Sequence, residues 1–403
     1  MNVISYSNLD QAPACRWANR KLSTLLRLGI AASLLGALAA QGQTLQVIHS
    51  FDNTNGASPK ASLILGTNGN FYGTTSAGGT NGSRGTIFTS TPNGGVTMLV
   101  SLKDTNGNCP LAGLAQGTDG NYYGTTEYGG NLGYGLVYQT TADGILTVLA
   151  SFANTNGLYP SAGVVQGPDG SFYGTTHNGG DYGLGTAFRI TTGGVLTTLL
   201  SFNGTNGAYP GALALAPDGA FYGTTGAGGH SYGTVFRMAV DGTLSTLASF
   251  DYTNGSTPAA ALVLGADGAF YGTTCNGGSS ESYLNGDGTV FRVTTNGELK
   301  MLVSFNGSNG RWPQGALTPG ANGGFYGTTQ SGGSSFAGSV FKVTTNGILT
   351  VLALFDNGGA KHPMAGLTPG PDGNLYGTTS DGGTYGAGAI FRLNLSPLLQ
   401  SPI

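Results

Sequence analysis

Short apolar runs separated by turn-forming residues fill most of the chain. From residue 113 to residue 159 it reads "GLAQG", "TDGN", "YYGTT", "EYGGNLGYG", "LVYQT", "TADG", "ILTVLASF" and "ANTNGLY". Asp-Gly and Asn-Gly pairs tolerate the positive φ of tight hairpins, and the runs between them are rich in β-branched and aromatic residues. The pattern predicts an antiparallel sheet of four strands. No segment after residue 43 shows the 3.6-residue period of an amphipathic helix, so we expect an all-β fold.

This four-stranded unit repeats along the chain. The sequence Tyr-Gly-Thr-Thr begins at Tyr72, Tyr123, Tyr173, Tyr222, Tyr271, Tyr326 and Tyr376. Repeats about 50 residues long are typical of propellers, solenoids and other arrays, in which each unit buries its faces against its neighbours. The sequence therefore predicts seven units of one repeat domain.

The two ends of the repeat region distinguish a closed ring from an open stack. Thr44–Phe51, "TLQVIHSF", matches the fourth strand of the other units, whereas the seventh unit supplies only a third strand in Gly388–Leu395, "GAIFRLNL". This offset predicts a seven-bladed β-propeller of four-stranded antiparallel blades, closed by an N-terminal strand that joins three C-terminal strands. The alternative is a linear β-solenoid, which would not need an N-terminal strand out of phase.

The N-terminal segment follows the pattern of a secretory signal peptide. An uncharged apolar run over residues 28–40 follows four basic residues and ends in the small residues Ala37 and Ala39; the basic residues are Arg16, Arg20, Lys21 and Arg27. We expect a signal peptide at 1–39, a propeller domain at 40–396 and a short tail at 397–403. The protein would then be exported to a secreted, periplasmic or cell-surface location. The alternative is an uncleaved N-terminal anchor, although the run is short for a membrane span.

Removal of this segment changes the charge of the chain. The mature chain has 11 basic and 17 acidic residues, a formal charge near −6. We therefore expect neither a nucleic-acid partner nor binding to an anionic membrane, and no membrane span after signal removal. Cys109 and Cys275 lie in the second and fifth units, too far apart around a ring to form a disulfide. The oligomeric state is left open.

Several motifs resemble a known family of exported bacterial proteins. "DGNLYGTT", the Gly-Gly pair that follows it, "GTVFR" and "LTVLASF" are similar to the GloVer tandem repeat, and the likeness covers about residues 44–395. The resemblance implies an exported repeat protein without an established biochemical activity. Members are described as "choice-of-anchor" proteins because a C-terminal anchoring segment often follows the repeats. Here the chain ends "LNLSPLLQSPI", with no apolar span and no basic tail, so we expect the family's C-terminal anchor to be absent.

The repeated residues are predicted to be architectural. A residue present in every blade occupies seven equivalent positions, whereas a catalytic site needs different groups that converge once. We expect the aromatic residue before Tyr-Gly-Thr-Thr to fill the space between blades, and the glycine to let neighbouring backbone approach closely. The innermost strands, from "ASLILG" to "AGLTPG", contain no Asp, Glu, His or Cys. A metal on the ring axis would need such ligands, so we expect no metal, no cofactor and no catalytic residue there.

Two positions differ from unit to unit. The residue before the proline that opens each unit is Ser58, Cys109, Tyr159, Tyr209, Thr257, Trp312 or His362, and the residue after Tyr-Gly-Thr-Thr is Ser76, Glu127, His177, Gly226, Cys275, Gln330 or Ser380. In a four-stranded blade both positions lie on the face that carries the loops between the second and third strands. Aromatic and hydrogen-bonding groups around a channel mouth suit sugars and peptides. Ordinary loop variation is the alternative.

An insertion selects one part of this face. Ser279–Asp287 lengthens the loop of the fifth unit and brings Glu281 and Tyr283 towards the side of Arg311 and Trp312. The predicted ligand-binding residues are Tyr159, Tyr209, Glu281, Tyr283, Arg311, Trp312 and His362. We predict a non-enzymatic binding or scaffold protein whose partner is a carbohydrate or a cell-surface protein. The alternative is a polysaccharide hydrolase or lyase that uses acids such as Glu127, Glu281 and Asp381.

Overall fold

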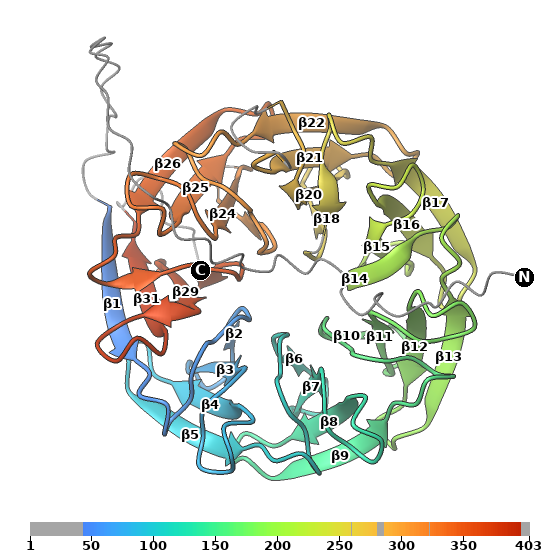
Figure 1. Cartoon of the computed structure of the whole chain (residues 1–403), viewed down its shortest axis with the longest axis horizontal. Coiled ribbons are helices and arrows are strands. Elements are labelled where there is room, and N and C mark those ends of the chain that lie inside the picture. Colours follow the sequence, from blue (N-terminus) through green and yellow to red (C-terminus); the bar gives the residue numbers. More distant parts are fainter. Residues whose placement is uncertain (1–42, 259, 280–285, 322, 396–403) are drawn as a thin grey trace, which may run out of the picture. The chain divides into compact units, whose positions relative to one another are not determined.

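A computed structural model describes residues 43–258, 260–279, 286–321 and 323–395. Every regular element in these ranges is a β-strand, and the strands form seven antiparallel blades of a β-propeller (Figure 1). The first three blades comprise, from the centre outwards, β2 (Ile64–Leu65), β3 (Phe71–Thr75), β4 (Thr86–Ser90) and β5 (Val96–Ser101); β6 (Ala115–Gln116), β7 (Tyr122–Thr126), β8 (Leu136–Thr140) and β9 (Leu146–Ser151); and β10 (Val165–Gln166), β11 (Phe172–Thr176), β12 (Thr186–Ile190) and β13 (Leu196–Ser201).

The next three blades follow the same order. They comprise β14 (Ala208–Leu215), β15 (Phe221–Ala227), β16 (Thr234–Met238) and β17 (Leu244–Ser249); β18 (Ser256–Pro258), β19 (Val263–Leu264), β20 (Phe270–Asn276), β21 (Thr289–Val293) and β22 (Leu299–Ser304); and β23 (Thr318–Pro319), β24 (Phe325–Thr329), β25 (Ser339–Val343) and β26 (Leu349–Leu354). The predicted all-β fold with seven blades is therefore confirmed.

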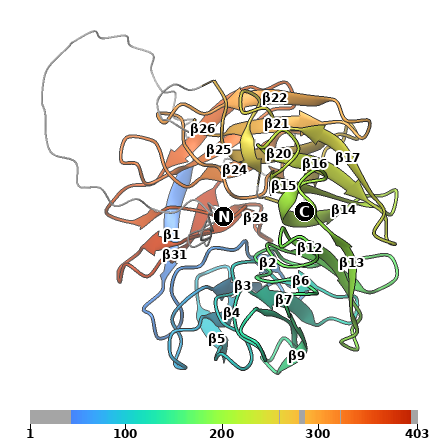
Figure 2. The same cartoon turned by 45° about the vertical axis from the view of Figure 1, so that its right-hand side comes forward.

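The seventh blade combines both ends of the described chain. Its strands are β28 (Thr368–Pro369), β29 (Leu375–Thr379), β31 (Ala389–Asn394) and β1 (Thr44–Ser50), and a separate small sheet joins β27 (Ala360–Lys361) to β30 (Asp381–Gly382). β1 pairs with β31 from Thr44 opposite Asn394 to Ser50 opposite Ala389, and both views show the two strands side by side (Figure 1, Figure 2). Phe51, which follows β1, is fully buried.

Aromatic rings pack the blades against one another. In most blades the tyrosine of Tyr-Gly-Thr-Thr contacts the ring that precedes the same motif in the next blade, with centroids 3.9–4.5 Å apart; the pairs are Tyr72–Tyr122, Tyr123–Phe172, Tyr173–Phe221, Tyr222–Phe270, Tyr271–Phe325 and Tyr376–Phe71. In the sixth blade Tyr326 packs in one cluster with Leu375. The predicted structural role of these aromatic residues is confirmed.

The repeated glycine makes room for a side chain. Gly73 lies directly opposite Phe88 in the neighbouring strand, and a Cβ at Gly73 would stand 2.6 Å from the Phe88 ring. The expectation that neighbouring backbone fills this space is therefore wrong, because the ring on the third strand lies over the glycine. The six equivalent glycines have the same relation to Tyr138, Phe188, Phe236, Phe291, Phe341 and Phe391.

The two threonines of the motif hold different parts of the propeller. In six of the blades the hydroxyl of the first donates to a carbonyl of the next blade; these bonds are Thr74–Ala112, Thr125–Ala162, Thr175–Gly211, Thr273–Gly315, Thr328–Ala365 and Thr378–Ala61. The hydroxyl of the second bonds within its own blade, as Thr75 does with Thr86 at 2.8 Å. Burying a hydroxyl is costly unless it is paired in this way, and the architecture supplies partners in these blades; the buried hydroxyl of Thr224 in the fourth blade is an exception, with no partner among the described residues.

Candidate functional site

The residue before each blade-opening proline has an unusual backbone. Its φ lies between +50° and +60° in all seven blades, in the left-handed region. In Tyr159 the N–H donates to the carbonyl of Tyr134 in the preceding blade, at 2.9 Å, and the carbonyl accepts the N–H of His177 in its own blade, at 3.1 Å. We call these seven residues the seam residues, because each joins two blades at the loop face; they are Ser58, Cys109, Tyr159, Tyr209, Thr257, Trp312 and His362.

The hydrogen bonds bring the two variable positions together. Each seam residue lies beside the residue that follows Tyr-Gly-Thr-Thr, either through a backbone bond or through the strand register; the pairs are Ser58–Ser76, Cys109–Glu127, Tyr159–His177, Tyr209–Gly226, Thr257–Cys275, Trp312–Gln330 and His362–Ser380. Sequence variation therefore gathers at the seams on the loop face, which is the face of the loops between second and third strands.

Aromatic side chains gather at the seams of blades two to four. Tyr159 packs edge to face against Tyr128 and Tyr134, with centroids 5.3 and 6.2 Å apart, and both of these tyrosines belong to the preceding blade. The ring of His177 stacks on Tyr209 of the fourth blade at 4.8 Å. We call these five residues the aromatic arc. Of the predicted ligand-binding residues, the structure brings Tyr159 and Tyr209 into this group.

A half-buried carboxyl lies at one end of the aromatic arc. Burial raises the pKa of Glu127, while hydrogen bonds from Tyr128 and Cys109 and the charges of Lys60 and His177 oppose the rise. Burial and the Glu127 charge raise the pKa of Cys109 to about 11. Cys109 therefore remains a thiol at neutral pH and is a poor nucleophile. Glu127 can accept hydrogen bonds when ionised and donate one when protonated.

The predicted site at blades five and six has a different character. The Arg311 guanidinium lies 2.5 Å from the Asp287 carboxylate, and the two side chains are only 6% and 0% exposed. The same guanidinium lies 5.5 Å from the ring of the half-buried Trp312. Glu281 and Tyr283 lie outside the described residues. The charge of Arg311 is thus neutralised inside the protein, where a buried ion pair holds the loop against the next blade.

His362 belongs to a small polar group in the seventh blade. Its Nδ1 lies 3.1 Å from the Asp381 carboxylate. The hydroxyl of Ser380 donates to Asp381 at 2.7 Å and also lies 3.1 Å from the carbonyl of His362. A Ser-His-Asp triad would require the serine hydroxyl to donate to the histidine ring. The three residue types are therefore present without the hydrogen-bond order of an activated serine.

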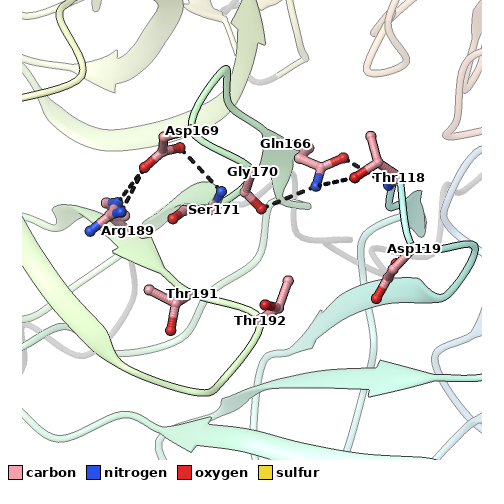
Figure 3. Close-up of a pocket in the computed structure, with 9 residues that line it drawn as sticks. All are labelled: Thr118, Asp119, Gln166, Asp169, Gly170, Ser171, Arg189, Thr191 and Thr192. Atoms are coloured by element: carbon pink, nitrogen blue, oxygen red, sulfur yellow. Dashed lines mark hydrogen bonds and ion pairs between the residues drawn. The ribbon is translucent and has the colours of Figure 1, made fainter.

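A polar cavity of about 460 Å³ opens on the opposite face, between hairpin turns of the second and third blades (Figure 3). Arg189 donates to Asp169 at 2.8 Å, and Gln166 accepts the N–H of Thr118 at 3.0 Å. Ion pairs of the same kind recur between Arg237 and Asp218, between Arg292 and Asp267 and between Arg392 and Asp372, and tyrosines of the repeat motif also donate to these aspartates. The charged groups of this cavity therefore belong to the repeat architecture.

Sequence reasoning missed three residues of the loop face. Lys60, Tyr128 and Tyr134 all stand at positions that differ between repeats, so a comparison of every column of the repeat would have found them. Cys109 and Cys275 are both thiols. Within the described ranges, no group of three His, Cys, Asp or Glu residues is placed to hold a metal ion.

The repeat and the fold both have counterparts among known proteins. A family described as the Gloeobacter/Verrucomicrobia repeat matches residues 34–166, 133–283 and 279–399. No curated protein matches the chain. The extracellular domain of a putative hybrid two component system from B. thetaiotaomicron is 13% identical with a TM-score of 0.56; the match covers 87% of this chain but only 41% of that one.

Two other solved structures are matched over most of their own length. A putative 6-phosphogluconolactonase from Bacteroides uniformis is 17% identical with a TM-score of 0.52, and the match covers 76% of this chain and 88% of that one. The periplasmic gluconolactonase of Pseudomonas aeruginosa is 16% identical with a TM-score of 0.52, with 83% and 99% of the two chains covered. At these identities the likeness shows the fold alone.

Proposed function

This chain belongs to the Gloeobacter/Verrucomicrobia repeat family, and from that membership we propose that it is an exported, non-enzymatic β-propeller that binds a carbohydrate or another extracytoplasmic partner. The loop face is the proposed binding surface. Within the described residues, no helix is long and apolar enough to cross a membrane.

The backbone of the seam residues carries this proposal. A left-handed φ costs a residue with a side chain about 1–2 kcal/mol, whereas glycine adopts it readily. The chain has 74 glycines and uses glycine at most of its other positive-φ positions, yet all seven seam positions carry a residue with a side chain. The identity of that residue also differs between most of the blades. Retained strain of this kind supports a functional surface.

Export is supported by the N-terminal pattern and by two proteins of similar fold, one an extracellular domain and the other periplasmic. Mass spectrometry of the protein recovered outside the cytoplasm should find a new N-terminus at Ala40. An intact N-terminus on exported material would instead indicate an uncleaved anchor.

Binding can be tested with residues 40–403 on immobilised glycans and isolated cell-wall fractions. Tyr209→Ala and Trp312→Ala alter seams in different blades, and at least one should weaken the strongest interaction roughly tenfold, a loss of about 1.4 kcal/mol. Ile145→Ser is the matched control, because Ile145 is 69% exposed in a turn on the opposite face. Absence of any partner, or a loss caused by the control alone, would contradict a binding loop face.

One observation favours the enzymatic alternative, a hydrolase or lyase that acts on polysaccharide. A half-buried carboxyl with a raised pKa, such as Glu127, suits a general acid. Glu281 lies outside the described residues, and Asp381 is held by His362 and Ser380. Release of new sugar ends from a polysaccharide, abolished by Glu127→Gln, would replace the binding proposal with catalysis.

A further inference from the structure

We propose that the aromatic arc and Glu127 form a single binding site for a neutral saccharide, whose ring stacks on Tyr128 or Tyr159 while its hydroxyls bond to Glu127. This inference rests on the proposed binding function and adds a place on the loop face and a class of ligand. It also moves the site away from the insertion in the fifth blade, towards the seams of blades two to four.

The seams are unequal around the ring, which indicates one site instead of seven. The aromatic arc occupies three consecutive blades. Seams in other blades carry small residues, such as Ser58 with Ser76, or a paired polar group, such as His362 with Asp381. Aromatic rings are fewer there: Trp312 stands beside the buried Arg311–Asp287 pair, and Tyr232 lies 5.5 Å from Tyr252 next to the Thr257 seam. A ligand that needs aromatic surface would therefore meet most of it between the second and fourth blades.

The aromatic arc is pre-organised. Tyr159 is bonded through its N–H to the second blade and through its carbonyl to the third, and two rings pack edge to face against it. Tyr128 is 41% exposed, so a ligand can reach its ring. Because the rings are already ordered, a ligand that buries them sacrifices little side-chain entropy. The C–H face of a sugar ring can cover such a surface while the tyrosine hydroxyl remains a polar partner.

The polar groups beside the rings match hydroxyl chemistry. A sugar hydroxyl both donates and accepts, and this site offers the Glu127 carboxylate as acceptor and the Lys60 ammonium as donor, with tyrosine hydroxyls able to do either. Glu127 lies within the electrostatic reach of both Lys60 and His177. The acidic mature chain would repel a polyanionic glycan, which favours a neutral sugar over a uronic acid polymer.

An array of neutral, amino and uronic oligosaccharides, followed by calorimetric titration of the strongest neutral binder, tests the proposal. Tyr128→Ala and Tyr159→Ala should each raise the Kd roughly tenfold, and Glu127→Gln should raise it several-fold. Tyr385→Ala is the matched control, because Tyr385 is 64% exposed in the corresponding loop of the seventh blade and lies outside the aromatic arc. Thermal unfolding verifies that each variant is folded.

Each contrary outcome has a distinct meaning. If no neutral oligosaccharide binds at about 10 mM, a concentration that would reveal even a very weak site, the saccharide inference is overturned. If binding is lost only in Trp312→Ala, the loop face still binds but the aromatic arc is the wrong place. If Tyr128→Ala, which alters an exposed ring, leaves the Kd unchanged while the control raises it, the inference also fails. Binding of a protein from the cell-wall fraction without any glycan would keep the general function and reject the ligand class.

Discussion

At the scale of single residues, each seam residue combines a strained left-handed backbone with a side chain that varies from blade to blade. A β-branched residue with positive φ is the most unfavourable case, and Thr257 is such a residue, at φ +56°. Asn tolerates the left-handed region better and lacks the extra chain entropy of glycine. Where the side chain itself is dispensable, replacing the residue with Asn should therefore relieve the backbone strain and raise the free energy of unfolding.

Thr257→Asn should stabilise the protein by about 1 kcal/mol, because it relieves the left-handed strain of a β-branched residue. Equilibrium unfolding in denaturant measures the change. Thr350→Asn provides the control, since Thr350 lies within the outer strand β26, where a change to Asn removes a good strand former. A destabilised Thr257→Asn variant would show that the hydroxyl contacts of Thr257 outweigh the strain.

Glu127 should make stability depend on pH. Its pKa in the folded protein is raised by burial, so the folded state holds the proton more tightly than the unfolded chain. The stabilisation is fully present below the ordinary pKa of glutamate, about 4.3, and is lost as the pH rises through the raised folded value. Glu127→Gln mimics the protonated form and does not titrate. As the pH rises from acidic to neutral, the melting temperature of the variant should therefore increase relative to that of the parent protein. A constant difference across a pH series would argue against the shift.

At the scale of elements, the strand that carries Tyr-Gly-Thr-Thr is held by three kinds of contact. Its tyrosine contacts the next blade, its glycine receives a ring from the third strand, and its first threonine bonds the next blade. Turn chemistry and strand composition were enough to predict this strand and its neighbours. The partners were not predictable, because a contact between blades joins residues that local periodicity does not relate.

The contribution of the threonine hydrogen bond between blades to the free energy of unfolding can be measured. Thr125→Val keeps the branched shape but leaves the carbonyl of Ala162 without its hydroxyl partner, so we expect a loss of about 1–3 kcal/mol. Thr147→Val alters an exposed position on the outer strand β9 and should change stability little. Denaturant unfolding compares the two variants. Equal effects would mean that the bond between blades contributes nothing specific.

The candidate site was only partly predictable for the same reason. Cys109, Glu127 and Tyr159 stood out as variable positions in the sequence, but Tyr128 and Tyr134 reach Tyr159 from the preceding blade. The pairing of Arg311 with Asp287 was equally hidden, because it joins the last residue of the fifth blade's insertion to a residue at the start of the sixth blade. Alignment of the repeats identifies which positions vary. A site, however, depends on which side chains of one repeat contact side chains at other positions of the next repeat.

At the scale of the whole molecule, the seventh blade makes the propeller depend on its first strand. Deletion of residues 43–51 removes β1 and the buried Phe51, and loss of a buried Phe side chain alone costs about 3–5 kcal/mol. We expect a sharply lower melting temperature, together with self-association through the exposed edge of β31. Calorimetry and size-exclusion chromatography with light scattering measure both effects. Deletion of 397–403 is the control, and a 43–51 deletion that melts like the parent would show that the ring does not need β1.

The pairing of β1 with β31 also sets an order in time. The ribosome makes Thr44–Ser50 before the first six blades and Ala389–Asn394 after them, so β1 cannot pair with β31 until all six have been synthesised. Closing so long a loop costs roughly 4 kcal/mol more chain entropy than closing a short hairpin. A chain cut short by a premature stop or a protease would keep an orphaned strand at its beginning. In every unfinished chain the segment of β1 would remain unpaired and exposed, so we expect cellular proteases to cleave such chains before they accumulate.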